Sequence, residues 1–170
     1  MPVTPFHFGL GLLGKGGAPR AVSLSAFVAS QVVIDCESAY YLFIAREWPV
    51  HRVMHTFVVA IPVAVAVGVA LWAVVARLGR VRAGPLLASD CGLFQCVVGG
   101  FLGGASHPFL DGIMHSDIQP LRPFVSSNPF LGLVGLGTLH LLCLLAGAIG
   151  LLLLGLRSML SRQPAVTPGG

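Results

Sequence analysis

The sequence predicts an all-α membrane protein with about four transmembrane helices and a short N-terminal re-entrant or interfacial helix. Three observations support this fold class. Only 9% of the 170 residues are charged and 55% are hydrophobic, whereas a soluble globular domain has about 25% charged residues. The mean hydropathy is +0.88. Several segments also reach the roughly 20 mostly apolar residues that a helix needs to cross the hydrocarbon core of a bilayer.

The first apolar stretch, residues 5–14, is too short to span a bilayer. We expect it to form an interfacial or re-entrant helix, with Thr4 as its N-cap and Pro5 at its first helical position. The glycine- and proline-containing sequence from Lys15 to Pro19 should end this helix. The predicted spanning helices follow at residues 21–44, 50–76, 85–115 and 129–156.

The chain length suits one compact domain, and we predict a single membrane-embedded domain with a metal site over residues 1–162. Residues 163–170 are rich in proline and glycine and are predicted to form a disordered tail. The basic residues flank apolar runs in small groups, which is not typical of nucleic-acid binding. We therefore expect membrane lipid as the partner and no nucleic acid, and the sequence indicates no particular protein partner.

The distribution of basic residues predicts the orientation of the chain in the membrane. With four spans, both termini and the loop between the second and third helices share one side. That side carries seven Lys and Arg residues and the opposite side carries three, so the positive-inside rule predicts cytoplasmic termini. The seven are Lys15, Arg20, Arg77, Arg80, Arg82, Arg157 and Arg162, and the three are Arg46, Arg52 and Arg122.

Histidines and acids interrupt the apolar segments at one-turn spacing. His51 and His55 open the second predicted helix, and His107, Asp111 and His115 repeat every four residues near the end of the third. Ionisable groups inside membrane-length segments are costly and mark functional sites by default. Because residues four apart lie on one face of a helix, each set presents ligands suited to a metal ion.

The predicted depths of these residues allow a single site. Asp35 lies in the outer half of the first predicted helix, where a carboxylate should be neutral or paired, and a metal ion is the simplest partner. At 1.5 Å per residue, Asp35, His55 and His107 converge about 10 Å below the outer surface. His7 reaches this depth only if residues 5–14 enter the bundle as a half-helix lined by protein or water.

Two carboxylates are candidates for proton transfer. Glu37 lies two residues after Asp35, about 200° further around a helix, so both cannot face one site. Glu37 is therefore a candidate general base, or it bonds to Arg46 or Tyr41. Asp117, if it is not itself a ligand, is the second candidate.

Simpler interpretations exist for each pattern. His51 and His55 could simply be two surface histidines at the membrane boundary. His107 and Asp111 could be a hydrogen-bonded pair within an ordinary membrane helix. The presence of both pairs in one chain favours metal binding. His140 stands alone among leucines, and we expect it to hydrogen-bond between helices rather than bind metal.

A set of short motifs links these residues to a known family. The set comprises Thr4-Pro5-Phe6-His7 followed by Gly9, Asp35, His51-Arg52 with His55-Thr56, His107-Pro108-Phe109-Leu110-Asp111-Gly112, and the segment from Pro120 to Phe124. With these motifs the chain resembles the bacterial YdjM-like family of inner-membrane-associated, metal-dependent hydrolases. The family has a second Asp where this chain has Glu37. The resemblance implies a metal site that includes His7, hydrolase activity and a multi-pass location in the bacterial inner (cytoplasmic) membrane.

A more distant similarity is to zinc-dependent phospholipase C and single-strand nucleases, helical enzymes that also bind zinc through a His-x-x-x-Asp pair. Motifs of other membrane hydrolases are absent from the sequence. It contains neither the H-E-x-x-H helix of zinc proteases nor the G-x-S-x-G turn of serine hydrolases.

The sequence and the resemblance together predict a membrane-bound hydrolase that uses metal-activated water on a lipid or lipid-linked phosphoester. It would hold one or two divalent ions, preferably zinc. The predicted metal ligands are His7, Asp35, His51, His55, His107, Asp111 and His115, and the predicted catalytic carboxylates are Glu37 and Asp117.

The alternative is a metal or proton transporter, or a metal-stabilised membrane scaffold without catalysis, because intramembrane His and Asp residues also serve ion pathways. A transporter needs polar residues on a path to both faces. Below the predicted site the helices offer only Ser30, Gln31, Asp90 and Gln95. So few polar residues favour a site that opens to one side of the membrane, and therefore the enzyme over the transporter.

Overall fold

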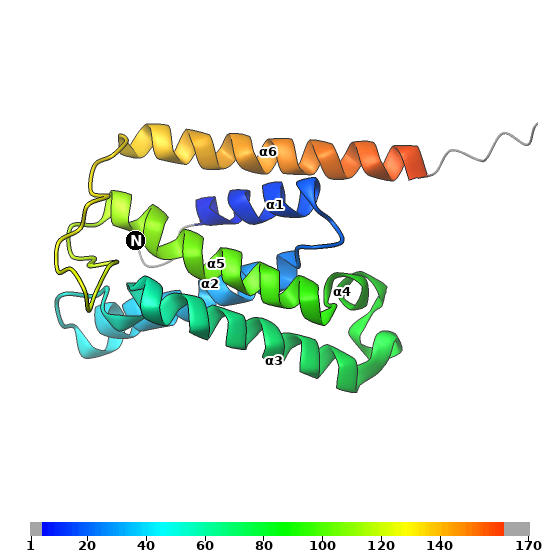
Figure 1. The fold of residues 1–170 in the computed structure, drawn as a ribbon, viewed down its shortest axis with the longest axis horizontal. Coiled ribbons are helices and arrows are strands. Elements are labelled where there is room, and N and C mark those ends of the chain that lie inside the picture. Colours follow the sequence, from blue (N-terminus) through cyan, green and yellow to red (C-terminus); the bar gives the residue numbers. More distant parts are fainter. Residues whose placement is uncertain (1–4, 162–170) are drawn as a thin grey trace, which may run out of the picture.

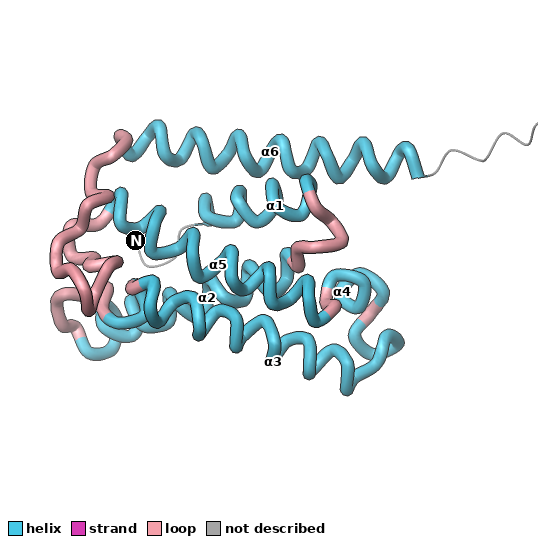
Figure 2. Tube along the Cα trace, viewed as in Figure 1, coloured by secondary structure: helices cyan, strands magenta, loops and turns pink. Residues whose placement is uncertain are grey.

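The computed structural model describes residues 5–161, in which the regular elements are all helical (Figures 1 and 2). Four segments are long and apolar enough to cross a membrane, and a short N-terminal helix accompanies them. The predicted fold class is therefore confirmed. Thr4 and the predicted tail lie outside the described residues. The four segments are Leu24–Ala45, Phe57–Gly79, Leu93–Met114 and Leu136–Ser161.

Three helices form the central bundle: α2 (Leu24–Ala39), α3 (Phe57–Ala83) and α5 (Leu93–Met114). The helix of α2 continues as a π-helical segment, η2 (Tyr40–Ala45). Glycines allow α5 to approach its neighbours closely, as the sequence predicts. A Cβ atom at Gly104 would lie 2.6 Å from the carbonyl oxygen of Ala60 in α3.

The N-terminal segment enters the bundle instead of lying across its end. A 3-10 turn, η1 (Pro5–His7), leads into α1 (Phe8–Gly17), which lies between α6 (Leu136–Ser161) and the other helices (Figure 1). Gly9 and Gly16 bring the backbone of α1 against that of α6. The helix therefore packs inside the bundle, as the re-entrant alternative requires.

The second predicted helix, over residues 50–76, is wrong at its start. Residues 50–52 are irregular, η3 (Val53–His55) is a 3-10 turn, and α3 begins only at Phe57. Two carboxylates explain this difference. Asp117 accepts the N–H groups of residues 50 and 51, and Glu37 accepts those of residues 52 to 54. These bonds satisfy the donors that would otherwise be left unpaired near the start of a helix.

The other two long helices also differ from prediction at their starts. The predicted helix over 85–115 is divided into α4 (Pro85–Asp90) and α5, because Gly92 is extended (φ −71°, ψ 150°) and its N–H donates to the side chain of Gln95. The last helix begins at Leu136, not at residue 129, and Gly132 in the preceding loop has a left-handed φ of 71°.

A partly buried ion pair fastens the end of the bundle opposite these loops. Lys15 of α1 lies 2.5 Å from Asp90 of α4, and Asp90 also accepts the N–H groups of Leu24 and Ser25 at the start of α2. Burial alone would raise the pKa of Asp90, but the hydrogen bonds from Lys15 and Ser25 outweigh it and hold that pKa below its usual value. Asp90 therefore joins three helices as an ionised carboxylate.

Candidate metal centre

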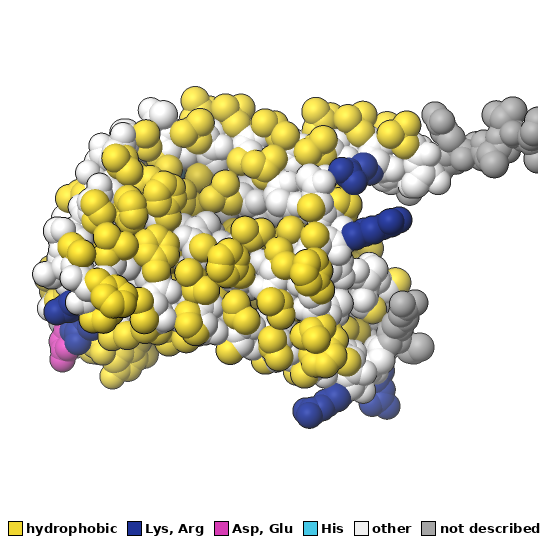
Figure 3. All heavy atoms as spheres, viewed as in Figure 1, with side chains coloured by type: hydrophobic (Ala, Val, Ile, Leu, Met, Phe, Trp, Pro, Cys, Tyr) yellow, Lys and Arg dark blue, Asp and Glu magenta, His cyan; other side chains and the backbone are white. Residues whose placement is uncertain are grey.

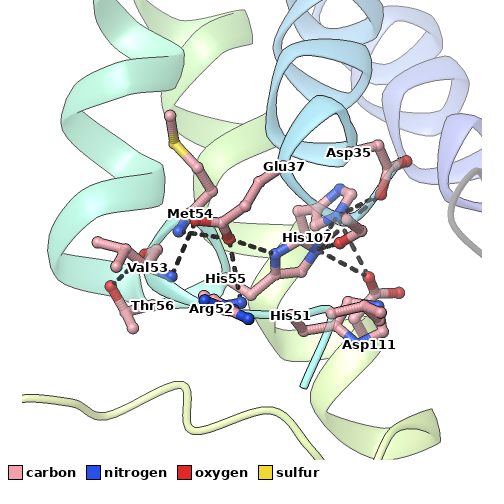
Figure 4. A network of polar contacts seen from close by, with 12 residues as sticks. Asp35, Glu37, His51, Arg52, Val53, Met54, His55, Thr56, His107 and Asp111 are labelled. Atoms are coloured by element: carbon pink, nitrogen blue, oxygen red, sulfur yellow. Dashed lines mark hydrogen bonds and ion pairs between the residues drawn. The ribbon is translucent and has the colours of Figure 1, made fainter. Parts of the chain in front are cut away.

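Four buried side chains from three elements converge where α2, η3 and α5 meet (Figure 4). Each offers one ligand atom, and these atoms all lie within 4.8 Å of one another. The side chains are almost inaccessible, with exposures between 0% and 6%. We call this set the inner cluster: Asp35, His55, His107 and Asp111.

The spacing of the inner cluster fits a small tetrahedral ion. His107 Nε2 lies 3.3 Å from Asp35 Oδ1 and 3.2 Å from Asp111 Oδ2. His55 Nε2 lies 3.6 Å from Asp111 Oδ2 and 3.9 Å from Asp35 Oδ1. Ligands about 2.0–2.2 Å from a tetrahedral zinc ion are about 3.3–3.6 Å apart. The donors therefore already stand close to the separation that such an ion requires.

The two histidines of the inner cluster face each other through the same type of nitrogen. Nε2 of His107 lies 3.3 Å from Nε2 of His55. The Nδ1 atom of His107 contacts the side-chain oxygen of Gln31, and Nδ1 of His55 lies 3.5 Å from Glu37. These acceptors can take the protons of the two Nδ1 atoms, which leaves both Nε2 atoms to ligate a metal ion. A cation between them would be bound by both rings.

Unsatisfied polar atoms extend the centre beyond the inner cluster. Buried polar groups in proteins nearly always have hydrogen-bond partners, yet His7 Nε2, His51 Nε2 and Asp111 Oδ1 have none. His7 Nε2 and Asp111 Oδ1 lie only 3.2 Å apart without forming a hydrogen bond. Buried imidazole nitrogens and carboxylate oxygens without hydrogen-bond partners are suitable ligands for a metal ion. η1 and α1 form the short helical segment that the sequence analysis requires, and they bring His7 to the inner cluster.

A second group, the outer cluster, comprises His51, His115 and Asp117, whose ligand atoms also lie within 4.8 Å of one another. The ring of His51 stands 4.7 Å from that of His55, so the two clusters adjoin. His51 Nδ1 lies 2.9 Å from Asp117 Oδ1, which leaves Nε2 free to bind metal. The structure thus brings His51 and His55 together, although they do not share the predicted helix face.

The protonation states of the outer cluster suit metal binding. Burial and the neighbouring His55 lower the pKa of His51, although Asp117 opposes this effect. Burial likewise lowers the pKa of His115. Burial would raise the pKa of Asp117, but the hydrogen bond from His51 outweighs it, and the net pKa is lowered. Neutral imidazoles and an ionised carboxylate are the forms that ligate metal ions.

Glu37 lies behind the inner cluster instead of facing it (Figure 4). It accepts the backbone N–H groups of Arg52, Val53 and Met54 at 2.9–3.0 Å. The described residues show no bond from Glu37 to Arg46 or Tyr41, so that predicted alternative is wrong. The carboxylate is bonded to the three backbone N–H groups instead. Glu37 therefore holds the turn that carries His55.

His140 lies outside both clusters. The sequence analysis predicts a hydrogen bond between helices at this position, and the described residues show a different contact. The ring of His140 stacks on Phe6 at 4.2 Å between ring centres, with the planes 16° apart. This contact joins α6 to the turn that carries His7.

Sequence reasoning did not assign the second layer of the centre. Gln31 contacts Nδ1 of His107, and Ser38 Oγ lies 3.3 Å from Nε2 of His55. Gln31 is four residues before Asp35 and Ser38 is three after it, so both share its face of α2. The one-turn rule that selected the ligands could therefore have found these residues as well.

The model of the YdjM inner membrane protein family matches residues 9–166. The chain belongs to this family. Its matched region contains both clusters and begins two residues after His7. The family name specifies an inner-membrane location and does not specify a reaction. No curated protein and no solved structure matches the chain.

Proposed function

We propose that the protein is a membrane-bound, metal-dependent hydrolase that acts on a lipid or lipid-linked phosphoester. The observation that carries this proposal is the inner cluster, in which two buried carboxylates and two buried imidazoles converge with their free lone pairs facing inward. A group of this composition is costly to bury unless a cation compensates it.

The two clusters supply ligands for one or two ions. Asp35, His55, His107 and Asp111 would hold the first, with His7 beside Asp111. His51 and His115 would hold the second. Mixed imidazole and carboxylate ligands suit zinc, manganese and iron, and the near-tetrahedral spacing favours zinc. A divalent ion bound here supplies Lewis acidity and lowers the pKa of a bound water to about 7.

The reaction that we propose adds the oxygen of one water molecule to phosphorus and breaks the bond between phosphorus and the ester oxygen. The attacking water gives up one proton, which the departing alcohol oxygen finally takes up, and its other proton stays on the released phosphate. Asp117 is the carboxylate placed to accept a proton, since it lies beside the metal centre and lines a cavity with His51. Glu37 serves this reaction by positioning His55.

The transporter alternative gains little support from the rest of the bundle. Ser30 Oγ donates to the carbonyl of Phe27, and Gln31 is held between Gly103 and His107. Gln95 and Asp90 cap the starts of helices. The side chains of these four polar residues are therefore engaged in hydrogen bonds within the protein and do not line an ion path. This supports a metal site that is reached from one side of the membrane.

The test is the metal content of the purified protein, measured by elemental mass spectrometry. We expect at least one divalent ion per chain in wild type and its loss in the double variant His107→Ala/Asp111→Ala. His140→Ala, which removes a histidine outside both clusters, is the control and should keep the metal. Metal at wild-type stoichiometry in the double variant would overturn the assignment of the centre. Chelation should also abolish phosphate release from lipid phosphoesters, and restored metal should recover it.

A further inference from the structure

We propose that a cavity beside the outer cluster binds the phosphate and the first part of the chain of a membrane lipid phosphoester. This inference rests on the proposed function, because it names the binding site of the substrate. The cavity has a volume of about 650 Å³, within the range of roughly 300–1,000 Å³ typical of small-molecule sites. His51 and Asp117 form part of its wall, so a ligand here reaches the metal centre.

The cavity carries an unpaired positive charge. Arg122 and Arg52 both line it, but they differ in their contacts. Arg52 bonds to Glu47 at 2.9 Å and lies over the ring of Tyr41. Arg122 forms no ion pair or side-chain hydrogen bond with any described residue. Its guanidinium is therefore free to bind a phosphate through paired hydrogen bonds.

An unsatisfied amide adds to this polar end. Gln119 lines the cavity, and its side-chain oxygen is buried without a hydrogen-bond partner. An amide group offers both donors and an acceptor, so it can bond to a phosphate oxygen or to its hydroxyl. Asp117 is the acid in the lining, and it accepts a hydrogen bond from the ring of His51. The polar end thus complements an anion.

The remaining wall of the cavity is apolar and exposed at the surface of the protein. Trp48, Val53 and Val58 line it with side chains that are 72%, 59% and 47% exposed. A tryptophan beside arginines is typical of the membrane interface, where lipid phosphates lie. Inorganic phosphate would use only the polar end. A phosphate joined to a hydrocarbon chain uses both ends, and we therefore assign the cavity to a lipid.

Binding can be measured on the full-length protein in detergent micelles, with a chelator present to prevent turnover. The probes are phosphatidic acid, diacylglycerol with the same chains, and inorganic phosphate. In a Trp72→Phe variant, which leaves Trp48 as the fluorophore, phosphatidic acid with brominated chains should quench fluorescence saturably. We expect phosphatidic acid to bind at least about tenfold more tightly than either other probe, because charged hydrogen bonds and apolar burial both contribute.

Two arginine variants locate the site. Arg122→Gln should weaken phosphatidic acid binding about tenfold or more. Arg77→Gln removes the same charge from the exposed far end of α3 and should leave binding unchanged. Equal binding of diacylglycerol, equal binding of inorganic phosphate, or equal effects of the two substitutions would each overturn the proposal.

The same measurements in His107→Ala/Asp111→Ala separate this inference from the proposed function. Neither residue lines the cavity, so the double variant should lose metal and keep its preference for phosphatidic acid. Lipid binding without phosphate release in the metal-loaded wild type would support the cavity and count against the hydrolase. Metal-dependent phosphate release that Arg122→Gln leaves unaffected would overturn the cavity alone.

Discussion

Carboxylates in this chain position histidines as much as they offer ligands. Asp117 and Glu37 accept the N–H groups of residues 50 to 54 and so fix the segment that carries His51 and His55. The sequence analysis selected these histidines for their one-turn spacing in a helix that the structure does not contain. Their proximity was predictable from spacing, but the turn was not, because it depends on acids 15 to 67 residues away in sequence.

His7 provides a test of the centre at the residue scale. We expect His7→Ala to weaken zinc binding about 10- to 100-fold or more, since even the loss of a residue that only supports a ligand typically costs this much. The physical reason is that buried His7 places an unpaired Nε2 atom 3.2 Å from Asp111. Zinc affinity can be measured by competition with a chromophoric chelator.

His140→Ala is the matched control for this measurement. It removes a half-buried histidine that stacks on Phe6 but offers no ligand to either cluster. Wild-type affinity in both variants would remove His7 from the centre and leave η1 with a purely structural role.

At the scale of helices, close backbone contacts replace large side chains. Gly104 of α5 meets Ala60 of α3, and Gly150 of α6 meets Leu12 of α1. Within lipid, where apolar burial gives little driving force, such contacts allow the dispersion interactions that hold helices together. The inner cluster depends on this packing, because His107 and Asp111 follow Gly104 on the same helix.

We expect Gly104→Val to destabilise the protein by about 1–3 kcal/mol, the usual cost of inserting atoms into a packed interior. A Cβ atom there would stand 2.6 Å from a backbone oxygen, which cannot rotate away. Thermal unfolding in detergent, followed by circular dichroism, measures the effect. Gly155→Val on α6, where a Cβ atom meets nothing within 4 Å, should unfold like wild type. Equal behaviour of the two variants would contradict the close packing of α3 and α5.

The junction at Asp90 predicts a dependence of stability on pH. Because its folded pKa lies below the usual 3.8, its contribution is complete above that value and is lost as pH falls through the lower folded pKa. Asp90→Asn should therefore lower the unfolding temperature at neutral pH, and its difference from wild type should shrink below about pH 4. Comparing the unfolding temperatures of the variant and wild type at each pH cancels the effect of other acids, which titrate in both proteins. A constant difference down to pH 3 would show that the charge of Asp90 is not involved.

Helix boundaries mark where sequence reasoning was weakest at this scale. Composition and length were sufficient to predict four spans and the short first helix. The break at Gly92 and the late start of α6 were missed, because the flanking residues are as apolar as the helices themselves. Hydropathy cannot separate a loop from a span when both are equally apolar. The backbone conformations of Gly92 and Gly132 mark these boundaries instead.

Across the whole molecule, the two clusters lie at the end opposite to most of the basic residues. Hydrophobic side chains cover the surface between the ends, and the Lys and Arg side chains gather at the two ends (Figure 3). Arg157 of α6 donates to the carbonyl of Gly17 at the end of α1, so these two helix ends lie together with Lys15. The clusters and the cavity lie at the other end, beside the loops that join η2 to α3 and α5 to α6.

This asymmetry gives the orientation a functional consequence. Seven basic residues against three predict cytoplasmic termini, which would place the metal centre toward the outer face and its lipids. A fluorescent protein fused after Gly170 should therefore fluoresce, because it folds in the cytoplasm. Alkaline phosphatase inserted within residues 126–128, where Ser126 and Ser127 are exposed in the loop before α6, should be active, because it needs the oxidising outer compartment. Exchanging the two reporters between these positions should abolish both signals. The reverse pattern would place the centre on the cytoplasmic side, where its substrates would come from the inner leaflet.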